Sequence, residues 1–258
     1  MDVTTVNTQW DFVRRGNFEQ GIALMKENFS DNPTPSTLVT LGLGYLWTAK
    51  YQEAAKHFQD WMDRYGVTAD AYFSLIGVAQ WCLSDYETAS SSWKLGLKAQ
   101  YIDMAGGTRL PLLLWAASIL RPNDKLRKEA VGLLDSKVKS PKVRHWPGPI
   151  AQFALDQIDA STLVEQSKER LSQKTPPSYR WEIAFYTHLR AKERGVMSSN
   201  EFKEVLRELV DTSVSEWSGD ENFLQLVRNP EFYIARHEVS AGSASATHVA
   251  NSTETDQT

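Results

Sequence analysis

The sequence predicts an all-α protein, built as a right-handed α-solenoid of about six antiparallel helix pairs and followed by a disordered C-terminal tail. The first observation behind this prediction is a pattern that recurs about every 34 residues in the N-terminal part of the chain. The second is a series of apolar segments with helical periodicity, separated by Gly- and Pro-rich turns, that runs to about residue 238. The third is the small, polar composition of residues 239–258, which is typical of a segment without stable structure.

The N-terminal repeats are recognised by an aromatic residue ahead of the second helix, at Phe18, Tyr51 and Tyr86. Each aromatic residue is followed by a small residue and then by a large apolar one. These two sets are Gly21, Ala54 and Ala89, and Met25, Phe58 and Trp93. The first helices of the second and third repeats carry a matching pair of residues, Leu41-Gly42 and Ile76-Gly77, followed by Tyr45 and Gln80.

This pattern resembles the tetratricopeptide repeat family, most closely over residues 36–100. We expect Gly42 and Gly77 to let two helices approach closely, with Ala54 and Ala89 contributing from the partner helix. The large residues that follow are expected to fill the space between neighbouring repeats. A unit of this size cannot bury its apolar face alone, so the repeats are expected to stack.

Three further helix pairs are predicted beyond the break at Gly106-Gly107. Their segments are 109–120 with 125–138, 149–158 with 161–174, and 179–195 with 198–210. Local signals support these boundaries: Asp124 lies near a helix start, Ser161 is a predicted N-cap, and Gly195 is a predicted helix stop. A short closing helix is predicted from the apolar residues Phe223, Leu224 and Val227.

Residues 146–210 also resemble bacterial helical-repeat proteins related to the NlpI lipoprotein, because a Trp-Pro opens one repeat and an aromatic-rich helix ending in Gly opens another. The chain departs from that pattern at His188, where a Gly is expected, and in lacking the lipoprotein leader. The predicted organisation is therefore three repeats in residues 1–105, further helix pairs of the same solenoid in 106–238, and a tail in 239–258.

The resemblance implies that the first helix of each repeat lines a concave surface. The partner-binding positions that it implies are Trp10, Arg14, Leu43, Leu46, Trp47, Val78 and Trp81. Such an apolar surface, with three tryptophans, is suited to an apolar helix or loop of another protein. The alternative is that the chain fills the groove itself, by later repeats or by the closing segment 217–235. Trp61, Trp93 and Trp115 are expected to pack between helices.

Composition and charge argue against several other classes of partner. The net charge of −4 and the pI of about 5.8 give no basic surface for nucleic acid. The longest apolar run, from Leu110 to Leu120, is too short to cross a bilayer, and no signal peptide is recognised. We therefore expect a cytoplasmic protein that binds neither nucleic acid nor membrane.

No pattern for catalysis, a metal or a cofactor stands out. Cys82 is the single cysteine, which excludes an intramolecular disulfide. The five histidines are scattered over different segments, with no pair at the spacing of a helical zinc site. Ser91-Ser92-Trp93-Lys94 lies within a predicted repeat helix, and Gly42-Leu43-Gly44 lacks the strand and third glycine of a dinucleotide loop.

The sequence therefore predicts a non-catalytic protein-binding module, an adaptor or scaffold that holds a segment of a partner. One alternative is a bacterial immunity protein that neutralises a cognate toxin domain, favoured by the acidic residues Asp211, Glu216, Asp220 and Glu221. A second alternative, an enzyme on a helical scaffold, is disfavoured and would require a polar pocket with perturbed carboxylates or histidines. Self-association is a further use of an apolar groove.

Overall fold

The computed structural model describes residues 17–28, 35–66, 68–168, 176–217 and 226–250. In these ranges the chain is all-helical, and its extended pairing is limited to one isolated bridge between Ala69 and Tyr101. The helices are α2 (Phe18–Asn28), α3 (Pro35–Trp47), α4 (Tyr51–Tyr65), α5 (Asp70–Cys82), α6 (Tyr86–Gly96), α7 (Arg109–Leu120), α8 (Asp124–Val138), the 3-10 helix η1 (Pro141–Arg144), α9 (Gly148–Ala154), α10 (Ala160–Gln166), α11 (Pro177–Glu193), α12 (Ser199–Trp217) and α14 (Pro230–Ala250). Consecutive helices pack against one another from α2 to α12, with η1 inserted between α8 and α9.

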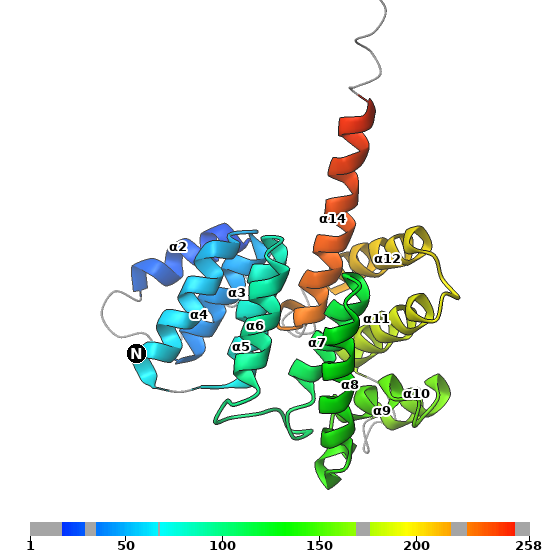
Figure 1. The fold of residues 1–258 in the computed structure, drawn as a ribbon. Coiled ribbons are helices and arrows are strands. Elements are labelled where there is room, and N and C mark those ends of the chain that lie inside the picture. The colour runs from blue at the N-terminus through cyan, green and yellow to red at the C-terminus, as the bar shows by residue number, and fades with distance from the viewer. Residues whose placement is uncertain (1–16, 29–34, 67, 169–175, 218–225, 251–258) are drawn as a thin grey trace, which may run out of the picture.

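Helix α14 departs from this sequential order. It packs against α5 and α12, which are far from each other in the sequence. Figure 1 shows α14 running between α2–α6 on one side and α7–α12 on the other, with its C-terminal half projecting beyond them. The last described helix therefore joins the two halves of the fold.

The predicted aromatic positions mark helix starts, because α2, α4 and α6 begin at Phe18, Tyr51 and Tyr86. A shared turn precedes most of the second helices. In five turns of the described chain, a backbone N–H donates to the carbonyl five residues earlier: Lys50 to Tyr45, Asp85 to Gln80, Asn123 to Ser118, Gln157 to Gln152, and Val196 to Ala191. This bond closes the end of a helix and turns the chain sharply into the next one.

The predicted close approach at Gly42 and Gly77 is confirmed. A Cβ atom on Gly42 would lie 2.4 Å from Cζ of Phe58, and one on Gly77 would lie 2.2 Å from Nε1 of Trp93. Phe58 and Trp93 thus pack directly on the glycine of their own helix pair. Phe58 also packs on Tyr72 of α5, at 6.3 Å between ring centroids, and so lies between neighbouring pairs as predicted. Trp93 also donates a hydrogen bond to the carbonyl of Ser74, which anchors the ring within the pair.

Asp124 is the first residue of α8, which confirms the predicted helix start, and the side chain of Asn123 caps this helix by accepting from the N–H of Leu126. The predicted cap of α10 is corrected by two residues. The side chain of Asp159, not Ser161, caps α10 by accepting from the N–H of Thr162. Gly195 ends α11 as predicted, with φ of +70°.

The C-terminal segment differs from the prediction in its extent. The sequence predicts that structure ends at about residue 238, whereas α14 begins at Pro230 and continues through Ala250. A helix already nucleated by packing gains one hydrogen bond for each residue that it adds, and residues 239–250 contain no proline to stop it. Of the residues predicted for the closing helix, Val227 is buried, and Phe223 and Leu224 lie outside the described ranges.

The core runs through both halves of the fold. Trp93 and Trp115 are fully buried and Trp61 is nearly so, which confirms their predicted packing role. In the part of the chain that the structure describes, no helix combines the length and the apolar content that a bilayer crossing requires.

Candidate partner-binding groove

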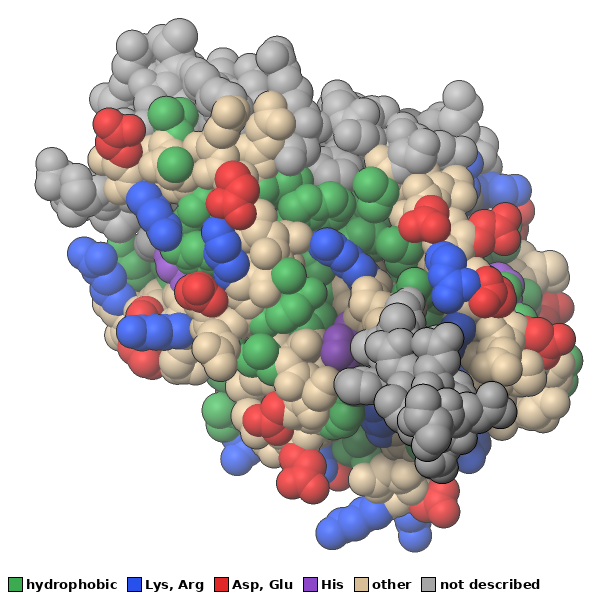
Figure 2. All heavy atoms as spheres, turned by 90° about the horizontal axis from the view of Figure 1, so that it is seen from above, with side chains coloured by type: hydrophobic (Ala, Val, Ile, Leu, Met, Phe, Trp, Pro, Cys, Tyr) green, Lys and Arg blue, Asp and Glu red, His purple; other side chains and the backbone are tan. Residues whose placement is uncertain are grey.

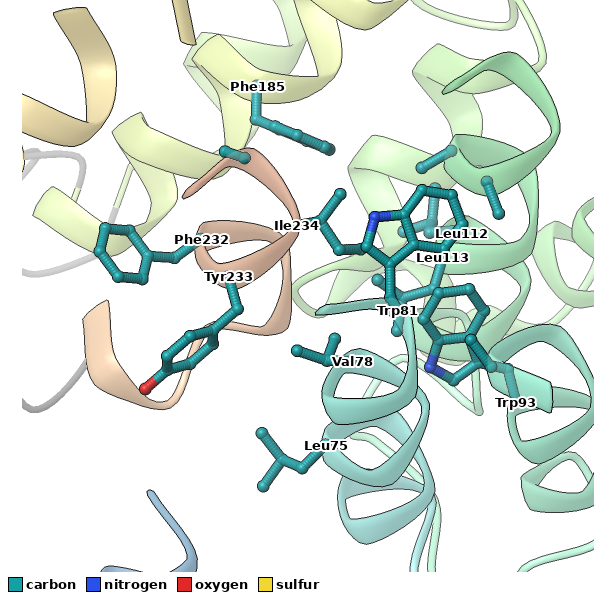
Figure 3. Packing of buried hydrophobic residues seen from close by; sticks show 14 of the residues in the cluster. Leu75, Val78, Trp81, Trp93, Leu112, Leu113, Phe185, Phe232, Tyr233 and Ile234 are labelled. Carbon is teal, nitrogen blue, oxygen red and sulfur yellow. The ribbon is translucent and has the colours of Figure 1, made fainter. Parts of the chain in front are cut away.

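The residues predicted to line an open groove are largely buried. Leu43, Leu46, Val78 and Trp81 are buried and Trp47 is half-buried, while Trp10 and Arg14 lie outside the described ranges. The first part of α14 lies against this surface. In Figure 3, Leu75, Val78 and Trp81 extend from one side of α5 towards Tyr233 and Ile234 of α14.

Trp47 makes the corresponding contact from α3. Its ring stacks between Phe18, at 4.8 Å between centroids, and Phe232 of α14, at 5.7 Å. The guanidinium of Arg236 lies over the same indole and donates a 2.9 Å hydrogen bond to the Trp47 carbonyl. Aromatic stacking and a cation–π contact therefore hold α14 at this end of the groove.

The sequence leaves two interpretations of this surface open, a groove that binds a partner and a groove that the chain fills itself. Leu46, Val78 and Trp81 are core residues here, and α14 packs against the helix that carries Val78 and Trp81. The physical reason is that α14 is tethered to the groove, so its apolar side chains reach this surface at a high effective concentration. A groove filled by the chain itself describes the structure, and the partner-binding role of these residues stays a prediction.

Polar contacts also hold α14, beginning with Glu231 near its first turn. The carboxylate of Glu231 is fully buried and accepts from Nη1 of Arg109, at 2.9 and 3.0 Å, and from the hydroxyl of Tyr186, at 2.7 Å. Burial and the neighbouring Glu231 raise the pKa of Tyr186 well above its ordinary value, so this hydroxyl remains a donor.

Glu182 of α11 shares the same arginine. Its Oε1 lies 3.2 Å from Nη1 of Arg109 and accepts from the side-chain amide of Asn229, while its Oε2 accepts from Nε1 of Trp146 at 2.7 Å. Burial raises the pKa of Glu182 to about 7; Arg109 opposes this shift and the second carboxylate, Glu231, adds to it. A buried carboxylate with a raised pKa is a feature found at functional sites, and among these two carboxylates Glu182 has it.

A second cluster lies two helical turns further along α14, at Glu238. Nη1 and Nη2 of Arg121 each donate to this carboxylate at 2.9 Å, and Nε1 of Trp81 donates to it at 3.2 Å. Arg121 also donates to the hydroxyl of Tyr86, which lies 3.3 Å from Nε2 of His237. Burial, together with the nearby Arg121, lowers the pKa of His237, which favours its neutral form.

Cys82 lies beneath α14 between these clusters. Its thiol contacts the carbonyl of Tyr233 at 3.7 Å, and burial raises the pKa of the thiol to about 12. A protonated, covered thiol is a poor nucleophile, so in this conformation Cys82 acts as a packing residue.

Sequence reasoning missed the four charged residues that anchor α14. Arg109 and Arg121 flank the apolar segment 110–120, and such flanking charges are ordinarily read as solvated helix ends. The prediction for the closing segment 217–235 rests on its apolar residues, whereas Glu231 lies in that segment and Glu238 just beyond it. Their spacing of two helical turns was the available signal, because it places both carboxylates on one face.

The surface around α14 remains partly apolar. Figure 2 looks onto the face from which α14 projects, and hydrophobic side chains reach the surface in its middle, with charged side chains spread around them. Where α7, α11, α12 and α14 meet, a depression of about 310 Å³ is lined by Leu120, Arg121, Lys192, Ser199, Phe202, Lys203 and Glu238. Three of these residues are cations and one is an anion.

Neither the described residues nor a comparison with known proteins assigns an activity to this chain. Among the described residues, no three His, Cys, Asp or Glu side chains are grouped so that they would hold a metal ion. A scan against protein-family models finds no match for this chain, and neither do searches of curated proteins and of solved structures.

Proposed function

We propose that this protein is a non-catalytic protein-binding scaffold, a solenoid of about six helix pairs of the tetratricopeptide type. Five turns with the same closing hydrogen bond, from Lys50 to Val196, support the repeated helix pair as the unit in both halves of the chain. The glycines covered by Phe58 and Trp93 support the resemblance to tetratricopeptide repeats in particular.

The observation that carries the proposal is the manner in which α14 is held. The groove encloses Glu231, Phe232, Tyr233, Ile234 and Ala235, each at most 1% exposed. A surface that wraps a helix so completely, with both aromatic stacking and paired charges, has the features of a helix-in-groove recognition site. The carboxylates of Glu182 and Glu231 belong to the same contacts and are buried, with relative exposures of 4% and 0%.

The toxin-neutralising alternative depends on an acidic C-terminal surface. Asp211 is exposed on α12, while the side chains of Glu216, Asp220 and Glu221 lie outside the described part of the structure. No described cluster of acids therefore favours this alternative over the general binding function.

The test is capture of a partner by the full-length chain from native lysate of its source cells, followed by reconstitution with the purified partner. Light scattering that gives a complex of defined stoichiometry, with no chemical change in the partner, is the expected result. A chain that remains a monomer and captures no stoichiometric partner would contradict the proposal. The position of the partner gene then separates the adaptor from the immunity protein, because a toxin gene next to the gene of this protein identifies an immunity protein.

A further inference from the structure

The polar contacts of α14 define a spacing that a ligand helix would have to match. Glu231 and Glu238 lie two turns apart on one face of α14. Each meets an arginine at a different end of α7, since Arg109 is the first residue of that helix and Arg121 directly follows its last. The groove therefore presents two guanidinium groups to two carboxylates of one helix.

The residues directly after the first acid supply the apolar part of the same pattern. Phe232 packs on Trp47 of α3 and on Trp181 of α11, at 5.7 and 6.0 Å between ring centroids. Tyr233 and Ile234 are also buried and lie on the α5 side of α14 in Figure 3. The groove thus accepts a helix with an acid, two aromatic residues and an aliphatic residue, followed by a second acid. Arg236, between the two acids, adds the contact with Trp47.

The second acid lies where the groove opens to solvent. The side chain of Glu238 is 8% exposed, whereas its partner Arg121 is 35% exposed. The depression beside this pair contains two further cations, Lys192 and Lys203, so its charge favours an incoming carboxylate. An acidic helix can therefore approach at this end of α14 before it competes for the covered part of the groove.

We propose that the groove is a receptor for an acidic helix of a partner protein, with carboxylates two turns apart and aromatic residues after the first, and that α14 occupies it as a displaceable ligand. This rests on the protein-binding function proposed above and specifies the chemistry of the partner. Because α14 belongs to the same chain, it competes for the groove at a high effective concentration. A partner helix must bind the groove tightly enough to overcome this competition.

A labelled peptide of residues 226–240 tests the proposal with the full-length chain. This acidic peptide takes its name from Glu231 and Glu238, which Arg228 and Arg236 balance in net charge. The chain variant Glu231→Gln/Glu238→Gln keeps the shape of α14 and removes both of its charges, so the acidic peptide should displace the altered helix. Fluorescence anisotropy is expected to show at least tenfold tighter binding of the acidic peptide than of the same peptide with both glutamates replaced by Gln. The matched chain variant Glu204→Gln, which alters an exposed ion pair on α12, should bind no better than wild type.

Equal binding of the two peptides, or binding of neither, overturns the proposal. If the double variant does not melt cooperatively, the two peptides are compared on the wild-type chain at higher concentration, where the same preference for the acidic peptide is required. A chain that captures a stoichiometric partner yet shows no such preference retains the general binding function and refutes only the acidic-helix proposal.

Discussion

Replacing Arg121 with Met should loosen α14 without disturbing the rest of the fold. The substitution keeps most of the length of the side chain and removes the two hydrogen bonds of 2.9 Å to Glu238. The carboxylate would then keep only the hydrogen bond from Trp81. Stranding one partner of a buried ion pair costs about 3–5 kcal/mol. Because the side chain of Arg121 is 35% exposed, we expect a smaller cost of about 2 kcal/mol.

Cys82 gives this prediction a direct assay. It is the single cysteine of the chain and lies under α14, 3.7 Å from the carbonyl of Tyr233. A thiol reagent reaches it when α14 opens, so under rapidly reversible opening the labelling rate follows the population of the open state. A cost of about 2 kcal/mol should accelerate labelling by about 30-fold at constant pH.

Two controls define the result that would refute this reasoning. Arg207→Met breaks an exposed ion pair on α12 and should leave the labelling rate unchanged. Glu238→Gln combined with Arg121→Met should cost less than the sum of the two single changes, because the residues form one contact. If Arg121→Met labels no faster than wild type, or if the two changes are simply additive, this ion pair does not hold α14 in place.

Three further predictions concern stability. Gly77→Ala should lower the free energy of unfolding in urea by about 1–3 kcal/mol, because the new Cβ would overlap Trp93. Gly132→Ala, within α8 and with open space around it, should instead raise that free energy by up to about 1 kcal/mol. Equal effects of the two substitutions would contradict the packing of Trp93 on Gly77. The pKa of Glu182 is raised to about 7 in the fold, so between pH 4.5 and 7 the folded state binds more protons than the unfolded state. The contribution of Glu182 to the free energy of unfolding should therefore fall as the pH rises towards 7. Thermal melts from pH 5 to 8 should show that Glu182→Gln removes this dependence on pH. Asp159→Ala should lower the free energy of unfolding through loss of the α10 cap, and no loss would argue against that cap.

The local architecture could be predicted because its signals lie close together in the sequence. The aromatic residues at Phe18, Tyr51 and Tyr86 coincide with helix starts, and Gly42 and Gly77 lie where two helices approach closely, as expected. The turns themselves were harder to read. Ala49, Ser84 and Asp156 adopt positive φ without being glycine, so the usual sequence marker of a helix end is missing at three of the five repeated turns.

The sequence does not predict that α14 fills the groove, because this packing depends on contacts between distant parts of the chain. The periodicity of α5 shows that Val78 and Trp81 belong to an apolar face, but not whether α14 or another protein covers that face. The extension of α14 through Ala250 was missed for a related reason. Packing of its first turns nucleates a helix that the composition of residues 239–250 does not suggest by itself.

The paired charges also explain why α14 takes a single position in the groove. Apolar contacts alone would tolerate a shift of α14 by one helical turn, because hydrophobic attraction is not directional. Such a shift would remove Glu231 from Arg109 and Glu238 from Arg121 together, leaving buried charges without partners. We therefore expect the ion pairs to contribute to register more than to net stability, in the same way that single polar residues set the register of coiled coils. A groove that discriminates between registers of its own helix would, by the same contacts, discriminate between partner helices with and without the two acids.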